Sequence, residues 1–202
     1  MEVLKGLPLR RSAKTAVVSL RWAALVFLVS ALELLLPAAD LTPSEYEVKA
    51  AFLYNFIKFV EWPAHKLETN APFVIAIAGD DPFNGGLERN VSGKRVNGRA
   101  IQVIRLRSER QVPNCHVLFV PNTESRRLPA LLQAAKGQSV LTVGESERFC
   151  DLGGIISFLM EANKVRFEIN LGAAEAEGLK ISSKLLSVAS RVRRQNTGTS
   201  RQ

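Results

Sequence analysis

Cysteine and histidine are the side chains best suited to nucleophilic chemistry, and this chain places one of each side by side, at Cys115 and His116. A cysteine acts as a nucleophile when a base lies close enough to take its proton. The segment Cys-His-Val-Leu-Phe-Val (115–120), however, has the composition of a buried strand, and adjacent residues of a strand point to opposite faces. We therefore expect these two side chains to diverge, which argues against a catalytic pair.

Metal and nucleotide chemistry also finds little support in the residue spacing. The chain has two cysteines and two histidines, and they are too scattered for a zinc site. The glycine-rich motifs that bind phosphate do not occur. Asp80 and Asp81 follow a buried run, where α/β proteins form their binding crevice, but Asp81 fits the simpler role of a cap. The sequence thus predicts no enzyme, no metal and no cofactor.

A second set of polar residues lies nearer the carboxyl terminus. In the run Arg-Phe-Glu-Ile-Asn, the side chains of Arg166, Glu168 and Asn170 share one strand face. Lys180 and Ser182 follow at a predicted helix N-terminus, where backbone N–H groups favour anions. These five residues form our candidate site for a partner or a ligand. The alternative is a solvated strand face with an Arg–Glu pair, followed by a serine cap.

Strands and helices that alternate along most of the chain must position these residues. Thr42 and Glu45 have capping-box spacing, which predicts a helix that runs to about Glu61 and stops before Pro63. The remaining patterns predict strands at 73–78, 99–106, 115–120, 139–144, 155–160 and 164–170, and helices that start near 81, 123, 171 and 182. The last two strands flank a tight Glu-Ala-Asn-Lys turn. The predicted fold is α/β: a single-domain sandwich with a mostly parallel sheet of about six strands, a C-terminal antiparallel hairpin and helices on both faces.

The first predicted helix is unusually rich in apolar side chains. At 100° per residue they form two adjoining stripes: Val48, Phe52, Phe56 and Phe59, and Leu53, Ile57 and Val60. Together these stripes are wider than one contact with a sheet requires. Either the helix is sunk between the sheet and other helices, or part of the apolar arc meets another chain.

Charge is concentrated at the two ends of the chain. The formal net charge is +8, of which residues 1–39 carry +3 and residues 191–202 carry +4, so the 40–190 core carries only +1. A core without a basic surplus argues against nucleic-acid binding. A basic stretch followed by an apolar run at 22–32 is typical of an export signal, and the alternative is an uncleaved N-terminal anchor. The basic tail at 191–202 is predicted to be disordered.

Export to an oxidising compartment would favour pairing of the two cysteines. A bridge between Cys115 and Cys150 would close a loop of about 35 residues. It requires the two Cα atoms to lie within about 7 Å of each other. Because Cys115 begins a predicted strand and Cys150 lies in a loop, this disulfide is a candidate that the fold has to decide.

Two long segments resemble a known family. EYEVKAAFLYNFIKFVEWP (45–63) and KVRFEINLGAAEAEGLKISSKLLSVA (164–189) are similar to the two ends of YfiR-family periplasmic regulatory proteins. CHVLFV, SVLTVGE and GGIISF lie between them in the family's order, so that the resemblance covers about 42–189. It implies a non-enzymatic periplasmic protein.

The function that the resemblance implies is repression by protein binding. The protein would bind the periplasmic domain of an inner-membrane diguanylate cyclase, keep it inactive, and so lower cyclic-di-GMP and biofilm formation. An outer-membrane lipoprotein as a second partner and a homodimer are also implied. The sequence leaves one other class open, a periplasmic sensor protein that binds a small ligand.

Overall fold

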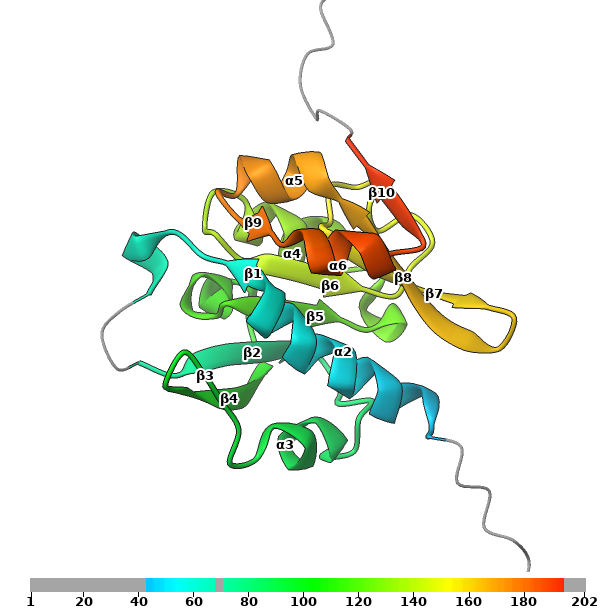
Figure 1. Ribbon diagram of the computed structural model, residues 1–202. Coiled ribbons are helices and arrows are strands. Elements are labelled where there is room, and N and C mark those ends of the chain that lie inside the picture. Colours follow the sequence, from blue (N-terminus) through cyan, green and yellow to red (C-terminus); the bar gives the residue numbers. More distant parts are fainter. Residues whose placement is uncertain (1–42, 68–70, 195–202) are drawn as a thin grey trace, which may run out of the picture. The chain divides into compact units, whose positions relative to one another are not determined.

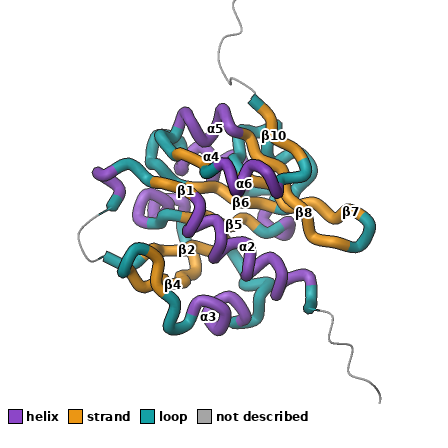
Figure 2. Tube along the Cα trace, in the orientation of Figure 1, coloured by secondary structure: helices purple, strands orange, loops and turns teal. Residues whose placement is uncertain are grey.

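The computed structural model describes residues 43–67 and 71–194 (Figure 1). The predicted export signal or anchor at 1–39 lies outside the described residues, as does the tail at 195–202. Within the described part, a central β-sheet is covered by helices on both faces (Figures 1 and 2).

The central sheet has eight strands in the order β10-β8-β7-β6-β5-β2-β4-β3. Its members are β2 (Phe73–Ala78), β3 (Arg95–Val96), β4 (Arg99–Leu106), β5 (Val117–Val120), β6 (Leu141–Gly144), β7 (Ile156–Glu161), β8 (Lys164–Asn170) and β10 (Arg191–Arg193). Strands β4, β2, β5, β6 and β7 are mutually parallel, while β7 pairs with β8 in an antiparallel hairpin. The α/β fold with a mostly parallel sheet and a C-terminal hairpin is therefore confirmed. The two additional strands, β3 and β10, are short and lie at the two edges of the sheet.

Helices form the outer layers. They are α2 (Glu45–Phe59), α3 (Gly86–Val91), α4 (Leu128–Ala135), α5 (Leu171–Ala176) and α6 (Ser183–Val188), with 3₁₀ turns at Ala64–Lys66, Glu109–Asn114 and Asn122–Glu124. Successive residues of a strand point to opposite faces of the sheet, and they form two separate buried clusters there. Ile75, Ile77 and Phe119 pack with α2, α3 and α6 on one face. Ala76 and Leu118 pack with α4 on the other.

Helix α2 differs from its prediction at both ends. It begins at Glu45, and its capping box is formed by Ser44 and Glu47 rather than by Thr42, which lies outside the described residues. The Ser44 hydroxyl accepts the Glu47 N–H at 3.3 Å, and the Glu47 carboxylate accepts the Ser44 N–H at 2.7 Å. The helix ends at Phe59 because Val60–Glu61 forms a short strand, β1, antiparallel to β9 (Lys180–Ile181).

The apolar arc of α2 is buried on its inner side. Phe56 is fully buried, and its ring lies 5.8 Å from that of Phe158 and 5.2 Å from that of Phe167. Phe52 and Phe59 pack against the same cluster but are only partly buried. The sunken-helix alternative therefore accounts for most of the arc.

Three further boundaries differ from the predictions. The helix expected near Asp81 begins at Gly86, because the Asp81 carboxylate accepts the N–H groups of Phe83 and Gly85, both at 2.9 Å, and holds a turn. Helix α4 begins at Leu128 with Pro129 in its first turn, where a missing N–H costs nothing. The prediction of disorder from residue 191 is wrong for Arg191–Arg193, which pair with β8.

Candidate functional site

Cys115 and His116 lie at the amino end of β5 and point to opposite faces of the sheet. The Cys115 thiol is buried in the cluster under α4, where it contacts the Val112 carbonyl oxygen at 3.1 Å. The His116 ring lies on the other face, and its Nδ1 accepts the Val74 N–H at 3.1 Å. Burial raises the pKa of Cys115 to about 12 and lowers the pKa of His116 to about 4. Near neutral pH the pair is thus a thiol and a neutral imidazole on opposite faces, which does not form a nucleophile and its base.

The proposed bridge between Cys115 and Cys150 is not formed. Both residues are free and buried. The carbonyl oxygen of Cys150 accepts the side-chain amide of Asn170 on β8, at 3.1 Å. Strand β8 is three strand spacings from β5, or roughly 14 Å, and a disulfide needs Cα atoms within about 7 Å. The sequence left this bridge open because sequence distance does not reveal which strands lie between the two residues.

The carboxyl ends of β2 and β5 form the switch point of the sheet. From β2 the chain moves to β4 on one side, and from β5 it moves to β6 on the other, which is where doubly wound proteins bind ligands. Here the crevice is occupied by the Glu124 side chain. A carbon added to Gly79, which has φ of +67°, would lie 2.1 Å from Glu124 Oε1. Glu124 is held by Arg127 at 2.9 Å, so the crevice beside Asp80 and Asp81 is closed by the protein itself.

The five candidate residues at 166–182 do not converge on one site. Arg166 is exposed, whereas Glu168 and Asn170 are buried. The Asn170 side chain caps α5 by accepting the Ala173 N–H at 3.1 Å. Lys180 and Ser182 lie in and after β9, and Ser182 caps α6. The two caps, Asn170 on α5 and Ser182 on α6, agree with the alternative interpretation of the sequence, in which these side chains stabilise the fold and bind no ligand.

Glu168 is the exception, because it forms part of a charged cleft. Its side chain is 1% exposed, and Oε2 lies 2.9 Å from Arg193 and 3.3 Å from Arg191, both on β10. These residues line a cleft of about 1000 Å³ that also borders α2, the carboxyl end of β6 and the β7–β8 hairpin. A strand that was predicted to be a disordered tail therefore supplies one wall of this cleft.

The opposite wall of this cleft is held by a buried ion pair that sequence reasoning missed. The Lys49 ammonium lies 2.5 Å from Glu145 and also contacts Glu45. Burial lowers the pKa of Lys49, but the hydrogen bonds to Glu145 and Glu45 outweigh it and the pKa is raised. Glu145 also accepts the Asn122 N–H at 3.1 Å. The sequence did contain one sign of this buried ion pair, because Lys49 interrupts the apolar arc of α2.

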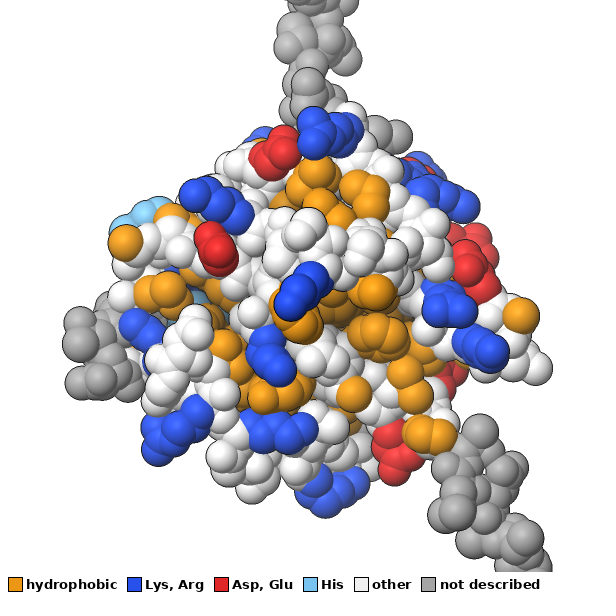
Figure 3. Space-filling view, in the orientation of Figure 1, with side chains coloured by type: hydrophobic (Ala, Val, Ile, Leu, Met, Phe, Trp, Pro, Cys, Tyr) orange, Lys and Arg blue, Asp and Glu red, His pale blue; other side chains and the backbone are white. Residues whose placement is uncertain are grey.

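Large apolar side chains are exposed along the margin formed by the hairpin, α6 and β10. Met160 is 52% exposed, Val188 58% and Val192 42%. The three elements are joined by Ser190, whose hydroxyl donates to Glu161 at 3.1 Å and whose N–H donates to the Phe167 carbonyl. Figure 3 shows the α2–α6 face, where apolar side chains lie between scattered Lys and Arg side chains. We call Met160, Val188 and Val192 the hairpin margin.

Within 43–67 and 71–194, no helix is long and apolar enough to cross a membrane. In the same ranges, no group of three or more His, Cys, Asp or Glu side chains is placed to hold a metal ion.

These features define a doubly wound α/β domain with an internally closed switch point and a charged cleft beside an apolar margin. The family model described as YfiR/HmsC-like matches residues 46–190, and the chain belongs to this family. Periplasmic regulators in the context of cyclic-di-GMP are what this family is known for.

A solved structure of low sequence identity shares the fold. A conserved domain protein from Vibrio cholerae O1 biovar El Tor matches with a TM-score of 0.51 and 14% identity, over 74% of this chain and 60% of that chain. The ABC domain in complex with L-Trp from Streptococcus pneumonia matches with a TM-score of 0.45 and 14% identity, over 60% of this chain and 55% of that chain. This chain thus covers less than two thirds of the length of either structure. At such identity the first likeness shows the fold alone.

Proposed function

We propose that this protein is a periplasmic repressor that binds the periplasmic domain of an inner-membrane diguanylate cyclase and lowers cyclic-di-GMP. The observation that carries the proposal is membership of the YfiR/HmsC-like family over 46–190, which includes nearly all of the described domain. On this proposal the folded part acts after export across the inner membrane.

The described surface is suited to binding rather than to turnover. The one adjacent Cys–His pair is divided between two faces of the sheet, with the pKa of each group shifted away from reactivity. The hairpin margin, in contrast, exposes Met160, Val188 and Val192 beside the charges of Arg191 and Arg193. Exposed apolar side chains rimmed by charge are typical of protein interaction sites.

The mechanism would be a shift in the population of the cyclase. A repressor acts if it binds the inactive form of its partner more tightly than the active form. Moving the partner from mostly active to mostly inactive needs a difference of about 5 kcal/mol in binding free energy. We extend the proposal to a homodimer as the binding form and to an outer-membrane lipoprotein that competes for the protein.

Two measurements test the proposal together. Deletion of the gene should raise cellular cyclic-di-GMP, and a plasmid copy should restore the original level. The purified protein should bind the isolated periplasmic domain of a membrane cyclase from the same cell, in a calorimetric titration. Unchanged cyclic-di-GMP in the deletion strain, with no cyclase captured by the protein, would refute the proposal.

The second class, a small-ligand sensor, is favoured by one observation. A separate cavity lies between α4 and α5, away from the five residues that the sequence suggested for such a site. A sensor would bind a small molecule there whether or not a cyclase is its partner.

A further inference from the structure

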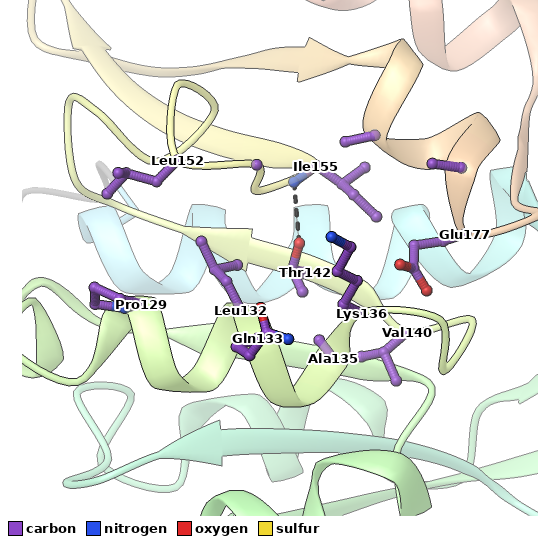
Figure 4. Close-up of a pocket in the computed structure, with 13 residues that line it drawn as sticks. Pro129, Leu132, Gln133, Ala135, Lys136, Val140, Thr142, Leu152, Ile155 and Glu177 are labelled. Carbon is purple, nitrogen blue, oxygen red and sulfur yellow. Dashed lines mark hydrogen bonds between the residues drawn. The ribbon is translucent and has the colours of Figure 1, made fainter. Parts of the chain in front are cut away.

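A cavity of about 260 Å³ lies on the α4 face of the sheet, between α4 and α5 (Figure 4). Its apolar wall includes Leu132 of α4, Ile155 before β7 and Ala173 of α5. Val140, just before β6, and Thr142, in β6, also line it. Of the residues that line the cavity, Leu152 also borders the charged cleft, and none lies on α2 or α6.

Two of the polar side chains that line this cavity, Thr142 and Lys136, can donate a hydrogen bond to a ligand. Thr142 is 3% exposed, and its Oγ1 accepts the Ile155 N–H at 3.0 Å. Within the described residues, the Thr142 hydroxyl group donates no hydrogen bond of its own. In Figure 4 the Lys136 ammonium points into the cavity, toward the space between Thr142 and Ile155. Lys136 forms no ion pair with any acid in the part of the chain that the structure describes.

The one acid at the cavity is already engaged. Glu177 accepts the Gly137 N–H at 2.7 Å and the Ser139 N–H at 3.0 Å, so its oxygens are directed at the turn after α4. A positively charged ligand would meet the like charge of the Lys136 ammonium, which lines the same cavity. A negatively charged ligand, in contrast, would meet the Lys136 ammonium and the Thr142 hydroxyl, which is the donor set that a carboxylate accepts.

The size of the cavity limits the ligand. A cavity of about 150 Å³ holds one benzene molecule, so about 260 Å³ holds roughly ten non-hydrogen atoms. The end away from Glu177 is apolar, formed by Pro129, Leu132 and Leu152 (Figure 4). Leu152 is 45% exposed, and a ligand tail would cover it. A phospholipid is too large for this space.

We propose that this cavity binds a small monocarboxylate with an apolar tail. The carboxylate lies between Lys136 and Thr142, and the tail extends along Leu132 toward Leu152. The site does not depend on the proposed cyclase partner, because it lies on the opposite face from α2 and α6.

The test is calorimetric titration of the purified protein with sodium octanoate, which has about the expected size. Phenylacetate, of similar size, separates an aromatic from an aliphatic tail, and octylammonium reverses the charge. We expect saturable one-to-one binding of at least one of the carboxylates and none of octylammonium. Lys136→Gln should weaken that binding about ten-fold, because the positive charge that pairs with the carboxylate is lost.

Two further variants complete the design. Lys184→Gln removes an exposed lysine from α6 and should leave binding unchanged. Ala176→Phe places a large side chain at the mouth of the cavity, from an exposed position, and should abolish binding while thermal unfolding stays the same. The proposal is overturned if neither carboxylate binds up to about 10 mM, if octylammonium binds equally well, or if Lys136→Gln and Lys184→Gln behave alike.

Discussion

Phe56 is the residue on which the packing of α2 most depends. Its ring is fully buried and contacts the rings of Phe52, Phe158 and Phe167. Because neighbouring rings cannot close the cavity that a truncation leaves, Phe56→Ala should reduce the free energy of unfolding by about 3–5 kcal/mol. Urea denaturation measures this, with Lys58→Ala on the exposed side of the same helix as the control. A Phe56→Ala protein as stable as the control would show that α2 is not held by this contact.

His116 makes the stability depend on pH. In the folded protein burial lowers its pKa from 6.5 to about 4, with Lys66 and Arg99 adding to the effect. Between these two values the unfolded chain binds a proton at His116 and the folded chain does not, so stability falls as the pH decreases from about 6.5 to about 4. The loss is at most about 3 kcal/mol for this one group.

Urea denaturation at several pH values should separate this effect from the other titrating groups. His116→Phe should flatten the decline between pH 6.5 and 4, whereas His65→Gln, at the surface, should leave it in place. Equal slopes in the His116→Phe and wild-type proteins would contradict the assignment.

The two thiols should be unreactive in the native protein. Burial is the main cause that raises the pKa of both Cys115 and Cys150 to about 12, and Glu168 adds to it at Cys150. Since the thiolate is the reactive form, an aromatic disulfide reagent should label the folded chain very slowly. In denaturant without a reductant it should release two equivalents per chain. Fewer than two equivalents would mean that the cysteines are oxidised.

At the scale of elements, the sequence predicted the strand limits and the turn that depend on local residue patterns. The strands at 73–78 and 99–106 have the predicted limits, because an apolar run between turn residues defines a buried strand. The hairpin turn was predictable from the short Glu-Ala-Asn-Lys segment between two strand patterns. Ala162 and Asn163 both adopt positive φ there, a conformation that asparagine adopts more readily than alanine.

Features that depend on long-range pairing were not predictable. Val60–Glu61 leave the helix because Ile181 and Lys180, far along the chain, offer strand pairing. Long-range pairing also explains why the five candidate residues do not converge on one site. Alternation placed Glu168 on a polar face, but nothing local indicated that β10 would cover that face with two arginines.

A buried carboxylate, Glu168, adds to the strand pairing that holds β10 to the sheet. Arg193 is 23% exposed and bonds both Glu168 and Asp151, whereas Arg191 is 59% exposed. Removing Arg193 leaves the buried Glu168 with a weak partner, so Arg193→Met should cost about 2–3 kcal/mol. Arg191→Met should cost less than about 1 kcal/mol, because an exposed pair contributes little. Chemical denaturation of the two variants gives the comparison, and equal losses would refute this account of β10.

At the scale of the whole molecule, the two faces of the sheet carry different features. The α4 face holds the small cavity, and the hairpin margin lies at the β10 edge of the sheet. The switch point, where related architectures bind ligands, is filled by Glu124. Binding of a small molecule and binding of a protein can therefore use separate surfaces and be altered separately.

The proposed repression assigns the hairpin margin to the cyclase. Met160 and Val188 are the most exposed large apolar residues described, and neither belongs to a buried cluster. The double variant Met160→Glu/Val188→Glu should therefore unfold at the same temperature as the wild type. It should weaken binding of the cyclase domain by at least about ten-fold, because charged groups would have to be desolvated at the contact.

A matched control adds a charge at the opposite end of the sheet. Gln102 is exposed on β4, and Gln102→Glu should leave cyclase binding unchanged. In cells that lack the gene, the Gln102→Glu protein should restore low cyclic-di-GMP and the double variant should not. If the folded double variant restores it as well as the control does, the cyclase binds elsewhere, and the hairpin margin is an exposed surface with no part in repression.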